Sequence, residues 1–175
     1  MSETAPVLST LLQGLGDPDW EVRARSACAL GDLAAQAKGA VPALVGLLRD
    51  PHWYVRGRTA WALAKIGVDG EDAVAALLAA LKDEHWLVRS GACCGLGRVT
   101  TAGSAAVSAL LGGVKDEDAY VRQNAAWALG QTIAQVKAAG LDSAVRQALM
   151  ETLEDNVGDV RAEANASLEA LDLST

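Results

Sequence analysis

Apolar residues recur along the chain at the three- and four-residue spacing of amphipathic helices. A first run precedes the turn Gly16-Asp17-Pro18 and comprises Val7, Leu8, Leu11, Leu12 and Leu15. A second run, within a helix of about residues 19–35, places on one face Val22, Ser26, Ala29, Leu30 and Leu33. The apolar face of one helix must pack on that of the other, so the pattern predicts a helical hairpin.

The same hairpin pattern returns along the whole chain, marked by a Val-Arg pair. The pair occupies positions 22–23, 55–56, 88–89, 121–122 and 160–161, so three spacings of 33 residues are followed by one of 39. A fixed period of this size is typical of proteins built from stacked repeats. We therefore divide a single domain, residues 1–175, into five units of about 4–36, 37–69, 70–102, 103–140 and 141–173.

The one break in the period lies in the fourth unit, between Gln131 and Ser143. Nothing in the run up to Ala139 stops a helix, so we expect the helix to continue and to project past its neighbours. Gly140 should end it, and Asp142 or Ser143 should cap the next helix. The fifth unit is more polar, which suits a terminal cap, and we expect the ligand-binding surface to end before it. A neutral loop insertion is the alternative.

Composition and charge narrow the function classes. The chain carries 22 acidic and 15 basic side chains, a net charge of −7, which opposes binding to nucleic acid because a basic surface supplies most of that affinity. No apolar run approaches the roughly 20 residues of a membrane-spanning helix, so we expect no membrane partner. The sequence starts without the segments of a secretory signal, and its three cysteines form no disulfide framework. We expect a cytoplasmic protein.

The turn and second helix follow the pattern Leu-Leu-x-x-Leu-x-Asp-Pro-x-Trp-x-Val-Arg-x-x-Ala-x-x-Ala-Leu-Gly over nearly all of the chain. This pattern resembles HEAT repeats, and most closely the short HEAT-like units of phycobiliprotein lyases. The resemblance implies an all-α fold, a right-handed α-solenoid of five HEAT-like helical hairpins, that serves as an interaction scaffold. It also implies a ladder that joins Asp17, Asp50, Asp83, Asp116 and Asp155 with Arg23, Arg56, Arg89, Arg122 and Arg161.

All aromatic residues fall on the side of the second helices opposite the buried stripe, which lines the concave surface in HEAT arrays. The chain has five Trp, two Tyr and no Phe, so its core must be aliphatic. Exposed Trp and Tyr gathered on one surface usually mark a binding site. Together with basic and polar residues of the same face, the predicted ligand-binding residues are Trp20, Trp53, Tyr54, Arg58, Trp61, Trp86, Arg98, Tyr120, Asn124 and Trp127.

A structural role for these rings stays open. The Trp residues at the helix starts can instead cover the turn between helices. Trp61 and Trp127 stand in a column that alternates with Cys28 and Cys94, so each indole can pack over the small residue of a neighbouring unit.

We predict no catalytic residues and no metal site. His52 and His85 occupy equivalent turn positions one unit apart, too distant to share a metal ion, so we interpret them as helix-start residues. Cys28 and Cys94 have no histidine in register that would activate a thiolate.

Two functions from different classes remain. In the first, the concave aromatic face binds a peptide or protein segment, with Trp61 and Trp127 as anchors and no cofactor. In the second, which follows the lyase resemblance, the chain is a chaperone-like lyase subunit that holds a linear tetrapyrrole, a bilin, whose propionates pair with Arg58 or Arg98. We favour the first.

Overall fold

The computed structural model describes residues 4–67, 70–99 and 103–173, which form α-helices joined by short turns. The helices are α1 (Thr4–Gly14), α2 (Trp20–Asp32), α3 (Val41–Leu47), α4 (Trp53–Ile66), α5 (Glu71–Ala80), α6 (Trp86–Gly97), α7 (Gly103–Gly113), α8 (Ala119–Gln131), α9 (Ile133–Ala138), α10 (Asp142–Thr152) and α11 (Gly158–Asp172). A 3₁₀ helix over Ala34–Ala40 joins α2 to α3. Within these ranges no helix has the length and apolar character needed to cross a bilayer. The all-α prediction is confirmed.

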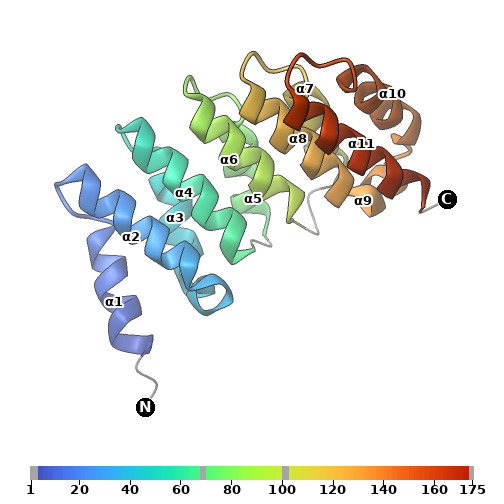
Figure 1. The fold of residues 1–175 in the computed structure, drawn as a ribbon. Helices are drawn as coiled ribbons and strands as arrows, with labels where there is room; N and C mark the ends of the chain where they lie inside the picture. The colour runs from blue at the N-terminus through green and yellow to red at the C-terminus, as the bar shows by residue number, and fades with distance from the viewer. Residues whose placement is uncertain (1–3, 68–69, 100–102, 174–175) are drawn as a thin grey trace.

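The helices form two layers that run along the array (Figure 1). The second helices of the hairpins, α2, α4, α6, α8 and α11, lie side by side in one layer, and α1, α3, α5, α7 and α10 form the other. Neighbouring second helices pack closely, whereas neighbouring first helices touch little. The array therefore curves toward the second helices, and it is an α-solenoid, as predicted, with α1 and α11 at opposite ends.

Small residues allow the second helices to approach one another. A Cβ atom on Gly31 would lie 2.8 Å from the Cα of Ala62, and one on Gly97 would lie 2.8 Å from the Cα of Ala128. Such distances leave no room for a larger side chain, so these positions set the spacing of the inner layer. The core lies between the layers, and its largest fully buried side chains include Leu30, Leu44, Leu63, Leu77, Leu96, Leu110, Leu129, Leu149 and Leu171.

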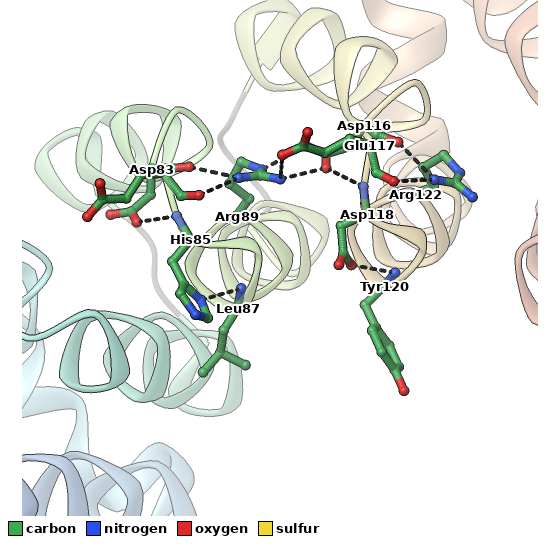
Figure 2. A network of polar contacts seen from close by, with 10 residues as sticks. Asp83, His85, Leu87, Arg89, Asp116, Glu117, Asp118, Tyr120 and Arg122 are labelled. Carbon is green, nitrogen blue, oxygen red and sulfur yellow. Dashed lines mark hydrogen bonds and ion pairs between the residues drawn. The ribbon is translucent and has the colours of Figure 1, made fainter.

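A ladder of arginine–aspartate pairs joins the turns of successive hairpins, and Figure 2 shows the pair formed by Arg89 and Asp116. Nε and Nη2 of Arg89 each donate to a carboxylate oxygen of Asp116 in the next turn, at 2.8 Å. Nη1 of Arg89 donates to the carbonyl oxygens of Asp83 and Glu84 in its own turn, at 3.0 and 3.1 Å. The same ion pairs join Arg23 to Asp50, Arg56 to Asp83 and Arg122 to Asp155. The ladder is confirmed for these pairs; Asp17 and Arg161, at the two ends, lie outside them.

The ladder holds its aspartates in the charged form. Burial opposes ionisation of Asp50, Asp83 and Asp116, but hydrogen bonds from the arginine and from a backbone amide outweigh it, so the pKa of each carboxyl is lowered. At Asp155 the hydrogen bond from Arg122 is the largest influence, and it too lowers the pKa. The ladder is therefore a set of compensated charges that fixes the turns.

The expected continuous extension of the fourth hairpin is wrong. α8 ends at Gln131, and Thr132, with φ −101° and ψ 25°, separates it from α9. The buried Thr132 hydroxyl donates to the carbonyl oxygens of Ala128 and Leu129, at 3.0 and 3.2 Å, a contact that bends helices. α9 packs against α7 and buries Val136, so it does not project from the array.

The end of this extension agrees with the sequence prediction only in part. Gly140 has a positive φ of 65°, and its N–H donates to the carbonyl oxygen of Lys137 at 3.0 Å. The next N–H, of Leu141, donates to the carbonyl oxygen of Val136 at 3.0 Å, which completes a Schellman motif. The expected cap of the next helix does not form, since Asp142 is the first residue of α10 and no side chain caps that helix.

Candidate functional site

Six rings form a continuous row, which we call the ring stack, along the N-terminal ends of the second helices. Its members are Trp20, His52, Trp53, His85, Trp86 and Tyr120. The closest ring centroids are those of Trp53 and His85, 3.8 Å apart, and of Trp20 and His52, 4.0 Å apart, each pair stacked. The Trp rings remain 37 to 39% exposed. Trp20 and Trp53 therefore each cover the N-cap histidine of the following hairpin, and Trp86 stacks on Tyr120, while the three Trp residues remain partly exposed.

The two histidines of the ring stack are the N-cap residues of their helices, as predicted. Nδ1 of His85 accepts a hydrogen bond from the backbone N–H of Leu87, at 3.2 Å (Figure 2). Nδ1 of His52 is buried and has no hydrogen-bond partner within the described residues. Across those same residues, no group of three or more His, Cys, Asp or Glu side chains is arranged to hold a metal ion.

The inner layer also encloses a hollow of about 280 Å³, the central hollow. It lies where α4, α6, α8 and α11 meet, and its lining residues are Trp61, Ala64, Lys65, Cys94, Arg98, Gln123, Asn124, Trp127 and Glu163. Four predicted ligand-binding residues, Trp61, Arg98, Asn124 and Trp127, are thus brought together. The residues of the ring stack do not line this hollow.

Both indoles of the central hollow rest on glycines of α6. A Cβ atom on Gly91 would lie 3.1 Å from Cδ1 of Trp61, and one on Gly97 would lie 2.9 Å from Cζ3 of Trp127. Each indole therefore packs against a small residue of the neighbouring hairpin, as the packing alternative expected, but that residue is a glycine and not the cysteine of the same column. The two rings are nevertheless only half-buried, and they line the hollow.

The amide of Asn124 is engaged within the protein. Its Nδ2 donates to Oγ of Ser90 at 2.9 Å and to the carbonyl oxygen of Tyr120 at 2.8 Å. Its Oδ1 accepts a hydrogen bond from Sγ of Cys94 at 3.0 Å. Burial raises the pKa of Cys94 to about 12, so this thiol stays protonated and available as the donor. Asn124 therefore ties α6 to α8 beneath the hollow.

The charged groups of the central hollow differ in their pairing. Lys65 forms an exposed ion pair with Asp32, at 2.8 Å. The guanidinium carbon of Arg98 lies 5.5 Å from the ring centroid of Trp127, a cation–π contact. Glu163 is half-buried and makes no hydrogen bond or ion pair with any described residue. Burial raises the pKa of its carboxyl.

Arg58 and Tyr54 lie between the ring stack and the central hollow. Nε of Arg58 donates to Sγ of Cys28 at 2.7 Å, and its guanidinium carbon lies 5.9 Å from the ring centroid of Tyr54. Tyr54 in turn meets Trp20 and Trp53 edge to face. Arg58 also lines a small hollow of about 80 Å³ beside Trp61. The predicted residues therefore form two clusters that Tyr54 and Arg58 connect.

The expectation that the fifth hairpin stays outside the groove does not hold for the central hollow, because Glu163 of α11 lines it. A signal for this residue existed in the sequence, since Glu163 occupies the repeat position of Arg58 and Asn124. The emphasis on aromatic residues hid it.

A larger hollow, of about 800 Å³, lies on the opposite layer between α3 and α5. Its walls are mostly small or aliphatic side chains, with Glu71, Asp72 and Arg49 among the charged lining residues, and no aromatic ring lines it. It exists because the short α3 and α5 touch little. We regard the central hollow as the better candidate, because it combines ring faces with charged groups that converge on one place.

Comparisons with known proteins agree with this architecture. Residues 8–96 and 74–169 match the HEAT repeats family. No curated protein matches the chain by sequence. Among solved structures, a designed armadillo repeat protein in complex with the peptide (KR)4 is similar, with a TM-score of 0.74 and 24% identity over 96% of this chain and 83% of that chain.

One chain from each of two further complexes is similar as well. The complex of CpcE and CpcF of phycocyanin lyase from Nostoc sp. PCC7120 matches with a TM-score of 0.70 and 25% identity, over 93% of this chain and 98% of that chain. Kap95p, in its complex with RanGDP, matches with a TM-score of 0.73 and 18% identity, over 98% of this chain and 25% of that chain. Since the family match covers well over half of the sequence, the chain belongs to the HEAT repeat family.

Proposed function

We propose that the chain is a scaffold that binds an extended peptide or protein segment along its inner layer, with Trp61 and Trp127 as anchors. The observation that carries this proposal is the central hollow, where two half-buried indoles, a guanidinium and a carboxylate converge. Trp and Arg are the residue types most enriched among those that dominate binding energy at protein interfaces. The rings of the ring stack pack on one another at the starts of the second helices, and this proposal does not use them as anchors.

The size of the central hollow favours a side chain as its occupant. Pockets for small molecules and cofactors commonly measure roughly 300–1,000 Å³. The hollow, at about 280 Å³, lies just below this range and is open to the inner surface. It suits one or two side chains of a longer segment that lies across several second helices. The designed armadillo repeat protein, similar in fold, is in complex with a peptide.

A selection from a peptide-display library tests this proposal. We expect the protein to enrich peptides whose binding is lost in the double variant Trp61→Ala, Trp127→Ala. Trp53→Ala is the matched control, because it removes an indole that stacks on His85 outside the hollow, and it should leave the affinity within about twofold. If no peptide is enriched, or if the double variant binds the selected peptides as well as the natural chain, the proposal is wrong.

A second candidate is a lyase-like subunit that binds a bilin. The similarity to a chain of the CpcE and CpcF complex, which spans nearly all of this chain and of that chain, favours it. Arg98 would pair with a propionate, since it makes no ion pair within the described residues, whereas Arg58 is engaged by Cys28. Titration with phycocyanobilin, followed by bilin absorbance and Trp fluorescence, tests this function. The absence of any change at tens of micromolar bilin would argue against it.

A further inference from the structure

Glu163 differs from every other charged group that lines the central hollow. Lys65 is neutralised by Asp32, and Arg98 contacts the face of Trp127. Both basic side chains are exposed, so water screens their charges. Glu163 is half-buried and has no polar partner among the residues that the structure describes. Its charge is therefore the least compensated in the hollow.

A carboxylate in this situation is costly to the folded protein. Partial removal from water disfavours the charged form, and no hydrogen bond or ion pair with a described residue offsets that cost. The direction of its pKa, raised by burial alone, agrees with this description. The ladder aspartates are buried or half-buried as well, but each has an arginine. A carboxylate left uncompensated beside two ring faces gains the most when a cation arrives.

We propose that the central hollow receives a lysine or arginine side chain of the bound peptide, with Glu163 as its counter-ion and the indoles of Trp61 and Trp127 as its walls. This inference rests on the proposed function and specifies its ligand. A cation over an indole face is stabilised by the ring quadrupole, and more strongly when water is excluded. Arg98 already lies over the ring of Trp127 in this way, so Trp61 offers the ring face for the ligand cation and Trp127 bounds the hollow as a wall.

The overall charge of the protein supports the same class of ligand. With a net charge of −7, the chain attracts basic segments at long range and repels acidic ones. The carboxylate of Glu163 adds a local attraction for a cation to this general attraction. A test must therefore hold the net charge constant while it removes the local carboxylate.

Glu163→Gln and Glu169→Gln form a matched pair for this purpose. Both lie in α11 and both remove one negative charge, but Glu169 does not line the hollow, and its exposed carboxylate accepts a hydrogen bond from Asn165 that glutamine can replace. The probes are fluorescein-labelled peptides with acetylated and amidated ends. They share one sequence, taken from the display selection, and differ only at a central position that holds Lys, Gln or Glu. Affinities are measured by fluorescence anisotropy at about 150 mM salt, which screens exposed charges.

We expect the Lys peptide to bind about tenfold more tightly than the Gln and Glu peptides, and Glu163→Gln to remove this preference while Glu169→Gln keeps it. A preference for the Glu peptide would assign the ligand charge to Arg98 and overturn the inference. Equal binding of the three peptides, or equal effects of the two variants, would overturn it as well. In each of these cases the proposed function survives provided that the double Trp variant still loses binding, so the two failures are distinguishable.

Discussion

The turn edge of the inner layer and the central hollow use the same residue types in opposite ways. At the turn edge, Arg56 is bonded to Asp83, and Trp53 is stacked on His85. In the hollow, Arg98 has only a ring face, and Glu163 has no polar partner within the described residues. Trp, Arg and a carboxylate are present in both places, but only at the turn edge does the carboxylate have an arginine as its partner.

The comparison teaches that residue type and partial exposure do not identify a binding surface in a repeat array. Trp53 is more than a third exposed and yet lies face to face with an imidazole of the next hairpin. The ladder and the ring stack repeat from one hairpin to the next, and this regularity is typical of structural contacts. The central hollow contains a residue that breaks this regularity, because Glu163 stands where earlier hairpins have Arg58, Gly91 and Asn124. This departure from the repeat is the informative feature.

The strongest test of the comparison removes one rung of the ladder. Arg56→Ala leaves the carboxylate of Asp83 poorly solvated and without its guanidinium, which should cost about 3–5 kcal/mol of the free energy of unfolding. Arg161→Ala is the control, because Arg161 is exposed and donates to a carbonyl oxygen at the end of the ladder; it should cost less than about 1 kcal/mol. Urea denaturation followed by circular dichroism measures both. Similar losses would mean that the ladder does not stabilise the fold.

A second test compares a core residue with an indole of the hollow. Leu63 is fully buried, so Leu63→Ala should cost about 2–5 kcal/mol through the cavity it creates. Trp61→Ala should cost no more than about 1.5 kcal/mol, because the ring is only half-buried and lies over a glycine. Thermal melts of the two variants decide between packing and binding. If Trp61→Ala is as harmful as Leu63→Ala, Trp61 is a core residue.

Acid should weaken the turn edge and not the hollow. The carboxyls of Asp50, Asp83, Asp116 and Asp155 have lowered pKa values in the folded protein, so the unfolded chain binds more protons than the folded chain as the pH falls below the ordinary value of 3.8. Their contribution to stability is complete above that value and is lost as the pH falls through the folded pKa values. Asp83→Asn should show a smaller loss of stability between pH 6 and pH 3 than the natural chain. An equal loss would exclude the ladder as its source.

Ionisation of Glu163 should affect the stability of the fold in the opposite direction to ionisation of the ladder aspartates. Its pKa is raised in the folded protein, so the folded chain binds the extra proton, and protonation of this group stabilises the fold. Glu163→Gln should therefore be slightly more stable than the natural chain at neutral pH. The difference should disappear as the pH falls through the raised pKa toward the ordinary value of 4.5. A destabilising effect of Glu163→Gln at neutral pH would indicate that the carboxylate has a structural partner.

A modest gain in stability is expected at a hydroxyl that neither region uses. Thr59 is fully buried in α4, and its Oγ1 has no hydrogen-bond partner within the described structure. Thr59→Val should raise the free energy of unfolding by about 1 kcal/mol, because it removes an unsatisfied polar group at nearly constant volume. Thr132→Val is the control and should destabilise, since its hydroxyl donates to two carbonyl oxygens. Urea denaturation of both variants measures these changes, and a loss of stability in Thr59→Val would reveal a partner for this hydroxyl.

The fold could be predicted from the sequence because each signal occurs several times. A single Val-Arg pair or a single Asp turn is weak, but five copies in register leave little freedom. The ladder was expected from the resemblance to HEAT repeats, and the structure contains it between successive turns. The break at Thr132 could not be predicted, because helix propensity does not tell whether a threonine hydroxyl bonds to its own helix, and here tertiary burial favours that bond.

From the sequence, the candidate site could be predicted only as one face of the second helices, and not as a defined hollow. The repeat register placed Trp61, Arg98 and Trp127 on the inner side, and the structure brings them to one hollow. Register alone does not tell which groups are already paired across neighbouring helices. Asn124 is tied to Ser90 and Cys94, and Arg58 to Cys28, through contacts that depend on how two helices pack. The structure was needed to separate these engaged side chains from Glu163.

The close glycine contacts and the arginine ladder lie in the same layer, and this has a mechanical consequence. Second helices whose backbones already touch cannot move closer, and the guanidinium links resist their separation. A change in the curvature of the array should therefore leave the spacing within the inner layer nearly constant. It must instead open or close the gaps between first helices, such as the one between α3 and α5. A bound segment would therefore contact anchoring residues at a constant spacing while the curvature of the array changes.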